Sequence, residues 1–419
     1  MQPEKRHFGI ISPPVSGHIH PFGALGRELI ARGHQVTVFH MPDLAAKVKA
    51  EGLDFVAIGA EDHPEGSLPE SLARLARLEG LPALRFTIRA ICQTTEMICR
   101  AAPTAVRASG VDLLLVDQTQ PAGGSVAQHL RIPFVTICNA LALNREGPVP
   151  PPFTGWTYRD SLWARARNRL GYAISDRMMR PVARILNRYR KGWSLPKLAR
   201  PEDSFSELAQ ISQLPAAFDF PRRELPACFH YVGPLRDGSR TATAFPWERL
   251  DGRPLVYASL GTLQNRREQT FRCFAEACKG LDVQLVITHG GGLDEKAASA
   301  LPGDPVVVPY APQLEVLARA RLALTHAGLN TVLDALTHGV PLVAVPITYE
   351  QPAIASRVEW CGAGKVIPHT KLKVETLRSA IVEVLSNPAY RERAGLVKKS
   401  IQEAGGTRKA VDLIEKILI

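Results

Sequence analysis

Residues 310–351 constrain the fold of this chain more than any other stretch. They contain an apolar segment at 322–325, the loop sequence HAGLNT at 326–331, and an apolar pattern of helical period that ends near Gly339. A buried strand that passes through a glycine-containing loop into a helix is half of a βαβ unit. The stretch therefore predicts a parallel sheet with helices packed on its faces.

The HAGLNT loop also predicts a binding site for an anion. Four of its residues lie at the start of the expected helix: His326, Gly328, Asn330 and Thr331. Unpaired backbone N–H groups and the helix dipole favour negative charge at a helix N-terminus, and a phosphate is the simplest candidate. A helix cap would account for one of these polar side chains but not for all of them.

The same order of strand, small-residue loop and helix begins each half of the chain. In the first half, a strand at 7–12 precedes the loop PPVSG and a helix at 18–32. In the second half, a strand at 254–259 precedes a short loop and a helix near 266–280. We therefore predict an α/β protein of two doubly wound Rossmann-like domains that face a cleft at the carboxyl ends of both sheets.

A break in this pattern predicts the domain boundary. The segment RDGSRTATAF lacks helical or strand periodicity and is typical of a linker. We expect an N-terminal domain at 1–235, a linker at 236–246 and a C-terminal domain at 247–390. Helices are expected at 391–419, and they could cross back to the N-terminal domain.

Composition limits the class of protein. The 419 residues suit two domains of about 200 residues each. No apolar run approaches the roughly 18 residues of a membrane span, and the start, MQPEKRHFGIIS, lacks the apolar core of a signal peptide. The seven cysteines are odd in number and scattered without a CxxC pair, which predicts neither zinc nor a disulfide framework. A cytoplasmic protein fits best.

The net charge of +11 suits an anionic partner. Nucleic acid ranks last, because aromatic residues are only 6% and no nucleic-acid motif occurs. The basic residues gather at 159–191, where two acids, Asp160 and Asp176, accompany nine arginines and a lysine. Two interpretations stay open for this helical segment: a solvated face, or peripheral contact with an anionic membrane surface.

Five motifs resemble the UDP-glycosyltransferase (GT1-type) family of nucleotide-sugar-dependent enzymes. In order, they are GHIHP at 17–21, YASLGT at 257–262, YAPQ at 310–313, HAGLNT at 326–331 and EQ at 350–351. The resemblance covers about residues 7 to 415 and implies the GT-B fold. Within the family, residues 326–358 are most similar to the bacterial macrolide and zeaxanthin glucosyltransferase branch.

The resemblance implies that the C-terminal domain binds a nucleotide-sugar donor such as UDP-glucose, with no separate cofactor. The residues implied are Ser259, Gly261, Thr262, Tyr310, Gln313, His326, Gly328, Asn330, Thr331, Asp334, Glu350 and Gln351. The HAGLNT residues, with those of the 259–262 loop, would face the diphosphate. Such an arrangement can stabilise the charge of a departing diphosphate.

The remaining implied contacts concern the nucleoside and the sugar. Tyr310 would stack on the base where most plant relatives have Trp, and Gln313 would contact the nucleoside. Asp334 would accept hydrogen bonds from the ribose diol. Glu350, in place of the usual Asp, and Gln351 would contact the sugar. The DxD metal signature of other glycosyltransferases is missing from the sequence, so we predict a metal-independent reaction with no metal-ligating residues.

His18 is the candidate general base. It lies at a predicted helix N-terminus, where the dipole disfavours protonation and should keep the imidazole a base near neutral pH. His20 would point elsewhere. Asp117 ends an apolar strand at 111–117, and the resemblance implies that it pairs with His18 to orient the ring and stabilise the imidazolium. An Asp at a strand end can also cap the next helix, so both roles stay open.

These residues predict an inverting transfer of a hexose, with glucose expected, to a hydroxyl of an apolar acceptor. A carotenoid diol such as zeaxanthin fits the acid-poor, apolar segments 61–108 and 144–193. Three alternatives stay open: another lipophilic acceptor such as a macrolide, sterol or flavonoid; a GT-B epimerase or phosphorylase; and a non-catalytic nucleotide-binding Rossmann module. The acceptor, the choice of UDP over TDP, the hexose and the oligomeric state do not follow from the sequence.

Overall fold

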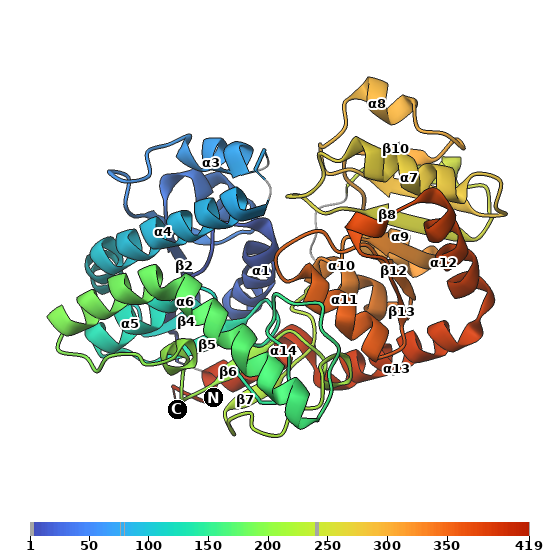
Figure 1. Ribbon diagram of the computed structural model, residues 1–419. Coiled ribbons are helices and arrows are strands. Elements are labelled where there is room, and N and C mark those ends of the chain that lie inside the picture. The colour runs from blue at the N-terminus through green and yellow to red at the C-terminus, as the bar shows by residue number, and fades with distance from the viewer. Residues whose placement is uncertain (1–3, 76, 79, 239–242, 419) are drawn as a thin grey trace.

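Two parallel sheets form the framework of the protein. The computed structural model describes residues 4–75, 77–78, 80–238 and 243–418. Each sheet carries helices on both faces, and the two α/β units lie side by side (Figure 1). The prediction of two doubly wound domains is therefore confirmed.

The N-terminal sheet contains seven strands in the order β3-β2-β1-β4-β5-β6-β7, and each strand is parallel to its neighbours. The strands are β1 (His7–Ile11), β2 (Gln35–His40), β3 (Asp54–Ala57), β4 (Leu113–Asp117), β5 (Phe134–Cys138), β6 (Gln210–Ser212) and β7 (Phe229–Tyr231). The helices are α1 (Ser16–Ala31), α2 (Ala45–Ala50), α3 (Ser67–Leu75), α4 (Gly80–Ala108), α5 (Pro121–Leu130) and α6 (Leu162–Gly192).

The C-terminal sheet repeats this arrangement with the order β10-β9-β8-β11-β12-β13, again fully parallel. The strands are β8 (Leu255–Ser259), β9 (Gln284–Thr288), β10 (Val306–Val308), β11 (Ala320–Thr325), β12 (Leu342–Ala344) and β13 (Gly364–Val366). The helices are α7 (Glu268–Cys278), α8 (Glu295–Ser299), α9 (Gln313–Arg319), α10 (Leu329–Thr337), α11 (Gln351–Trp360), α12 (Val374–Ser386), α13 (Pro388–Ala404) and α14 (Gly406–Glu415).

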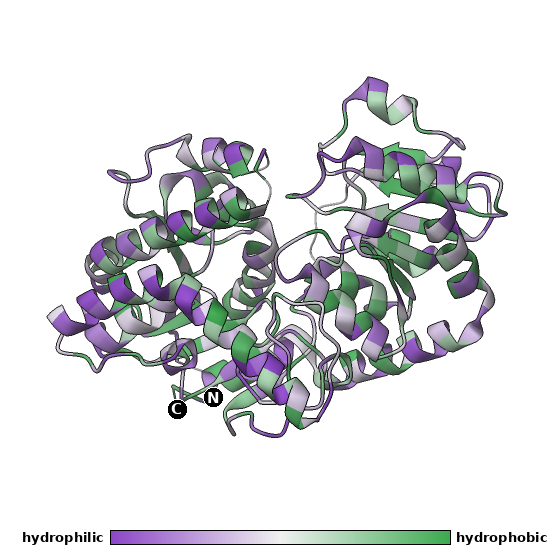
Figure 2. Ribbon diagram, viewed as in Figure 1, coloured by the Kyte–Doolittle hydropathy of each residue, from purple (hydrophilic) through white to green (hydrophobic). Residues whose placement is uncertain are grey.

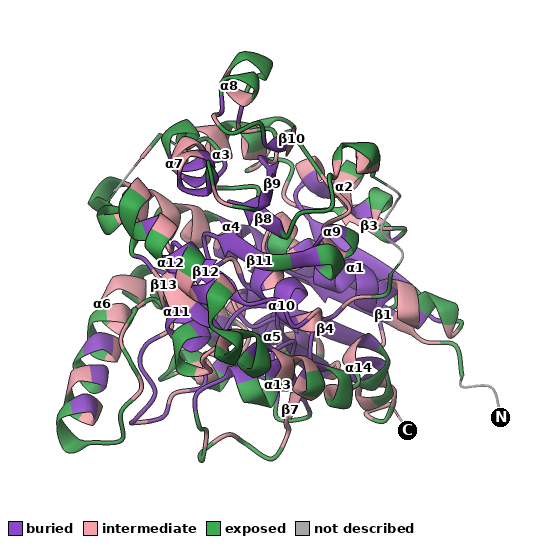
Figure 3. Ribbon diagram, turned by 90° about the vertical axis from the view of Figure 1, so that its right-hand side faces the viewer, coloured by how far each residue is buried: buried purple, intermediate pink, exposed green. Residues whose placement is uncertain are grey.

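The strand sequences explain why the sheets are parallel and covered. Strands β4, β5, β8 and β9 are buried at every residue, as a strand with helices on both of its faces requires. Hydrophobic colour accordingly concentrates on the strands in Figure 2. In Figure 3 the strands are mostly buried, while the covering helices expose their outer faces.

Both sheets reverse their strand order beside their first strand. The chain crosses from one side to the other between β1 and β4 in the first sheet, and between β8 and β11 in the second. Ligands of doubly wound proteins bind at the carboxyl ends of the strands at such a switch point. The loops after these four strands are therefore the place to look for a site.

The C-terminal segment divides between the two domains. Helix α13 packs on α10 of the C-terminal domain, whereas α14 packs on α1 of the N-terminal domain. Arg32 at the end of α1 contacts Asp412 at 2.7 Å and Glu415 at 2.8 Å. Of the expected linker, residues 239–242 lie outside the described residues.

Candidate active site

His18 and Asp117 meet at the switch point of the N-terminal sheet. His18 lies in the first turn of α1, and Asp117 is the last residue of β4. The Nδ1 atom of His18 lies 2.7 Å from the Oδ2 atom of Asp117. When Nδ1–H donates to the carboxylate, Nε2 keeps its lone pair and can accept a proton.

Neighbouring donors hold the Asp117 carboxylate in place. Its Oδ1 atom accepts hydrogen bonds from the Thr119 amide at 2.9 Å and the Thr119 hydroxyl at 2.6 Å. The Asn139 amide donates to Oδ2 at 3.0 Å. The carboxylate is fully buried, and burial raises its pKa, but the charge and hydrogen bond of His18 and the hydrogen bonds from Thr119 lower it below the usual range. Asp117 therefore stays ionised.

The charges around His18 differ from the expectation based on the helix dipole. Burial lowers the pKa of His18, but the charge and hydrogen bond of Asp117 and the charge of Glu350 raise it to a net value above the usual one. The two carboxylates favour the protonated ring, so the net shift runs in the opposite direction to the one expected from the helix N-terminus. The role of His18 as the base stays a prediction.

The HAGLNT loop lies at the second switch point, directly after β11. The ring of His326 packs between Gly261 and Gly328, where an added Cβ would lie 2.8 Å and 2.6 Å from the ring, respectively. Both glycines are thus required for the ring position. Burial lowers the pKa of His326 to about 4. The imidazole is neutral, so it can donate a hydrogen bond to a diphosphate but cannot supply positive charge.

The backbone of this loop opens the N-terminus of α10. Ala327 adopts a left-handed conformation with φ of 65°, which is uncommon for a residue with a Cβ atom and concentrates at functional sites. The N-cap residue is Gly328, and no side chain caps the helix. The first N–H groups of α10 are therefore not occupied by a cap, and they favour an anion.

Asn330 and Thr331 have different surroundings. The Asn330 side chain donates to the Gly17 carbonyl of α1 at 2.9 Å and lies 3.3 Å from Gln213, so its amide bridges the two domains. It was expected to face the diphosphate instead. Thr331 is buried in the first turn of α10.

The second loop of this site follows β8. The Ser259 hydroxyl accepts a hydrogen bond from the Gly261 amide at 3.2 Å. Gly261 has φ of 67°, in the left-handed region that favours glycine. Thr262 is exposed beside it. The loop thus brings Gly261 against His326. The two loops that were expected to face the diphosphate, 259–262 and 326–331, therefore lie together.

The nucleoside-contacting residues differ in their availability. The Tyr310 side chain is 56% exposed, and its hydroxyl donates to Gly290 at 3.3 Å. Asp334, in contrast, is fully buried between two donors, Gln313 at 2.6 Å and Arg236 at 2.9 Å. Each Asp334 oxygen accepts one of these hydrogen bonds, and the predicted contact with a ribose stays a prediction.

Glu350 and Gln351 lie at the start of α11. The Glu350 carboxylate accepts from the Leu141 amide of the N-terminal domain at 3.4 Å. Burial raises the pKa of Glu350, and the charge of His18 offsets part of that rise. The Gln351 oxygen accepts from the amides of Ile347 and Thr348, both at 2.9 Å, which fixes the loop before the helix.

Sequence reasoning missed the partners that hold these groups. Thr119, Asn139, Gln213 and Arg236 belong to none of the motifs, and their contacts depend on how separate elements meet. Among the described residues, no group of three or more His, Cys, Asp or Glu side chains could hold a metal ion. Metal independence of the reaction stays a prediction.

Comparison with known proteins identifies the family. Residues 195–401 match the model for "UDP-glucoronosyl and UDP-glucosyl transferase", and residues 16–112 match the glycosyltransferase family 28 N-terminal domain. A zeaxanthin glucosyltransferase of Pantoea ananas is 36% identical over 98% of this chain and 96% of its own length. One of Pseudescherichia vulneris is 35% identical over 98% of each chain.

Solved structures show the same architecture. The calicheamicin glycosyltransferase CalG4 has a TM-score of 0.76 and 25% identity, and it covers 99% of this chain and 98% of its own. The kitacinnamycin glycotransferase also has a TM-score of 0.76, at 24% identity, over 99% of this chain and all of its own. The predicted GT-B fold and the resemblance to bacterial glycosyltransferases are confirmed. The chain belongs to the UDP-glucuronosyl and UDP-glucosyl transferase family of GT-B glycosyltransferases.

Proposed function

We propose that this enzyme transfers glucose from UDP-glucose to a hydroxyl of an apolar acceptor, with a carotenoid diol such as zeaxanthin as the preferred class. One observation carries the proposal. His18 and Asp117 lie 2.7 Å apart, and the charge of Glu350, from the opposite domain, helps to raise the pKa of His18. Transfer needs a base beside the acceptor hydroxyl and a group that holds the donor sugar, and both must lie at the same site. The two zeaxanthin glucosyltransferases among the relatives support the choice of acceptor.

In the proposed reaction, the Nε2 atom of His18 takes the proton of the acceptor hydroxyl. The acceptor oxygen forms a bond to the anomeric carbon as the bond from that carbon to the diphosphate breaks, and UDP departs. Attack opposite the leaving group inverts the carbon and gives a β-glucoside. Asp117 stabilises the imidazolium that results.

The donor half would stabilise the leaving group. The uncapped N-terminus of α10 offers backbone N–H groups to the diphosphate, and neutral His326 adds a hydrogen-bond donor. Because His326 is uncharged, the compensating charge comes from the helix terminus. We propose that no divalent metal is needed for this step.

The His18–Asp117 pair also separates this function from the alternatives. An epimerase, a phosphorylase or a non-catalytic nucleotide-binding module would use the phosphate-binding loop, but none of them needs a base for an acceptor hydroxyl. Release of UDP only when an acceptor is present would favour transfer. Macrolides, sterols and flavonoids belong in the acceptor screen, with products identified by mass.

The decisive test uses purified protein, UDP-glucose and zeaxanthin. We expect UDP release and glucoside formation, and we expect His18→Ala to lower kcat by about 100- to 10,000-fold, the range that a general base contributes. Binding of UDP, measured by calorimetry, should persist in the variant. Undiminished turnover in His18→Ala would contradict the assignment of the base.

We further propose that the acceptor reaches the enzyme from a membrane surface through α6. Four large apolar side chains are exposed on its first half: Leu162, Trp163, Leu170 and Ile174. Exposed basic residues follow on its second half: Arg177, Arg180, Arg184, Arg188 and Lys191. Such a helix suits the interface of an anionic bilayer.

No helix within the described residues is long and apolar enough to cross a membrane. The seven free cysteines fit a cytoplasmic location.

A further inference from the structure

Helix α11 belongs to the C-terminal domain but contacts the N-terminal domain along its length. At its start, Glu350 accepts a hydrogen bond from the Leu141 amide at 3.4 Å. One and a half turns later, the Ser356 hydroxyl donates to the carbonyl of Trp156 at 3.1 Å. The helix that presents the sugar-contacting acid is therefore seated on the domain that carries the base.

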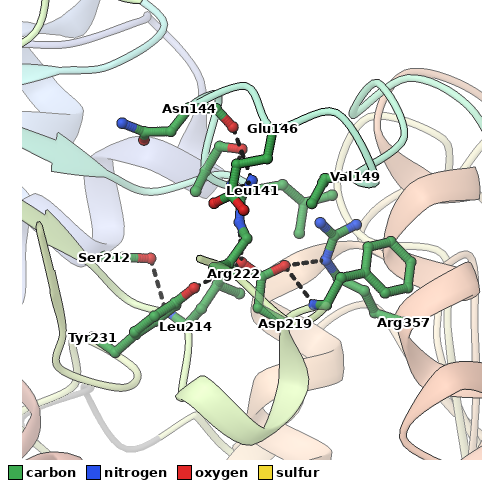
Figure 4. Close-up of polar contacts among 12 residues, drawn as sticks. Leu141, Asn144, Glu146, Val149, Ser212, Leu214, Asp219, Arg222, Tyr231 and Arg357 are labelled. Atoms are coloured by element: carbon green, nitrogen blue, oxygen red, sulfur yellow. Dashed lines mark hydrogen bonds and ion pairs between the residues drawn. The ribbon is translucent and has the colours of Figure 1, made fainter. Parts of the chain in front are cut away.

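The deepest contact of α11 is ionic. The Arg357 Nε atom lies 2.8 Å from the Oδ1 atom of Asp219, which belongs to the N-terminal domain (Figure 4). Arg357 is 1% exposed and Asp219 is 4% exposed. The second oxygen of Asp219 accepts from Arg222 at 3.1 Å and from the Tyr231 hydroxyl at 2.9 Å. The Phe220 amide also donates to Oδ1 at 2.8 Å, so each oxygen of this carboxylate accepts two hydrogen bonds.

Arg222 extends the network back to the loop that contacts Glu350. Its guanidinium donates to the carbonyls of Asn144 at 2.9 Å and Ala142 at 3.3 Å. Those residues follow Leu141, whose amide binds Glu350. Asp219 therefore connects, through one oxygen each, the helix that carries Glu350 and the loop that receives it.

Aromatic packing restricts the same arginine further. The Arg357 guanidinium lies over the Phe220 ring at 4.2 Å. Phe220 in turn contacts Trp360 of α11 and Tyr158, with ring centroids 5.8 Å and 5.5 Å apart. A planar guanidinium that is both stacked and hydrogen-bonded has one orientation, which a lysine cannot reproduce.

Stability alone does not account for this network. Burying an ion pair costs desolvation energy, and apolar residues of the same volume often stabilise a protein equally well. A hydrogen-bonded ion pair also fixes the relative position of its two side chains, because its hydrogen bonds are lost when either side chain shifts. Arg357 lies seven residues after Glu350, about 10 Å along a rigid helix. A shift at Arg357 is therefore transmitted to Glu350.

We propose that Arg357 and Asp219 are positioning residues that set the location of Glu350 relative to His18, and with it the approach of the donor sugar to the acceptor hydroxyl. This inference rests on the proposed glucosyl transfer. Neither residue touches the reacting atoms. They act through α11 and through the loop at 141–144.

The test compares Arg357→Lys and Arg357→Met with the unmodified enzyme in the UDP-glucose transfer assay. A misplacement of about 1 Å can cost about 100-fold in rate, so we expect kcat to fall by about that factor in Arg357→Met. Arg357→Lys keeps the charge but loses the planar stack, and its kcat should be intermediate. The dissociation constant of UDP should not change, because Tyr310 and Asn330 make their hydrogen bonds to Gly290, Gly17 and Gln213, which are not part of the network.

A matched control separates positioning from loss of stability. Val384 of α12 is 3% exposed in the core, away from the contacts of α11 with the N-terminal domain. Val384→Ala should lower the melting temperature. Its kcat, measured 20 °C below that melting temperature, should be retained. Full kcat in both Arg357 variants would overturn the inference, as would loss of UDP binding in parallel with kcat. If Arg357→Met does not fold, Arg357→Lys and Asp219→Asn decide by the same criterion. An unmodified enzyme without transfer activity would instead contradict the proposed function.

Discussion

At the scale of single residues, the His18–Asp117 contact is the feature with the clearest chemical consequence. Asp117 raises the pKa of His18 against the effect of burial, and Glu350 adds to the rise. The imidazole must be unprotonated to act as a base. The acid limb of the pH profile of kcat/KM should therefore lie above the pH that an isolated histidine would give.

Asp117→Asn tests this electrostatic argument. Removing the carboxylate charge takes away the largest influence that raises the pKa of His18, so the acid limb should move to lower pH. The maximal rate should fall at the same time, because the imidazolium loses its stabilising charge and the ring its preferred tautomer. A pH–rate profile of the variant and the unmodified enzyme measures both effects. An unchanged acid limb would show that Asp117 does not control the protonation of His18.

Motifs predicted the types of side chain at the site better than their partners. His18 and Asp117 were paired in the prediction and are hydrogen-bonded in the structure. Asn330 was expected on the diphosphate, yet its amide contacts Gly17 across the domain interface. Asp334 was expected on the ribose, and in the structure it accepts hydrogen bonds from Gln313 and Arg236. A motif reports which groups a loop carries, whereas a hydrogen-bond partner depends on how two domains meet.

At the scale of elements, the longer buried strands were predicted, and several of the three-residue strands were missed. The buried strands β4, β5, β8 and β9 carry near-continuous apolar runs that are easily recognised. Strands β6, β7 and β13 have three residues each, and no periodicity can be read from so few positions. They form because a neighbouring parallel strand supplies hydrogen bonds. Their existence is a property of the sheet, not of their own sequence.

The element α6 carries its own prediction, which concerns membrane contact. We expect the protein to sediment with vesicles of phosphatidylcholine and phosphatidylglycerol but weakly with phosphatidylcholine alone. Each basic side chain near an anionic surface contributes about 1 kcal/mol, and Arg180→Glu changes the charge by two, so this variant should weaken binding about 30-fold. Trp163→Ala should also weaken it, because the side chain is 70% exposed and would enter the interface.

The control for the α6 prediction is the same charge reversal elsewhere. Arg391 is exposed on α13, and Arg391→Glu changes the net charge of the protein by the same amount as Arg180→Glu. If binding depends on α6, only the Arg180 variant should lose vesicle affinity. Equal losses in both variants would indicate attraction by net charge alone and would contradict a specific membrane-facing helix.

At the scale of the whole molecule, several contacts within the described residues connect the two domains. Helix α11 and Asn330 contact the N-terminal domain, α13 packs on residues 216–218, and α14 packs on α1. The sequence predicted the two domains from repeated strand and helix patterns. It left open where the last helix lies, because the apolar face of a helix does not specify which domain it covers.

The position of α14 leads to a prediction about how the molecule unfolds. Ala410, Val411 and Ile414 are fully buried in the core of the N-terminal domain, although the helix follows the C-terminal domain in sequence. Replacing Ile414 by alanine removes buried apolar volume and should lower the free energy of unfolding of the N-terminal domain by about 2–5 kcal/mol. Because α14 couples the domains, its weakened docking should also split one thermal transition into two. Differential scanning calorimetry measures both outcomes.

Leu396→Ala, at a position 57% exposed on α13, is the comparison variant and should change neither the free energy of unfolding nor the number of transitions. A single, unshifted transition in Ile414→Ala would mean that α14 contributes no stability to the N-terminal domain.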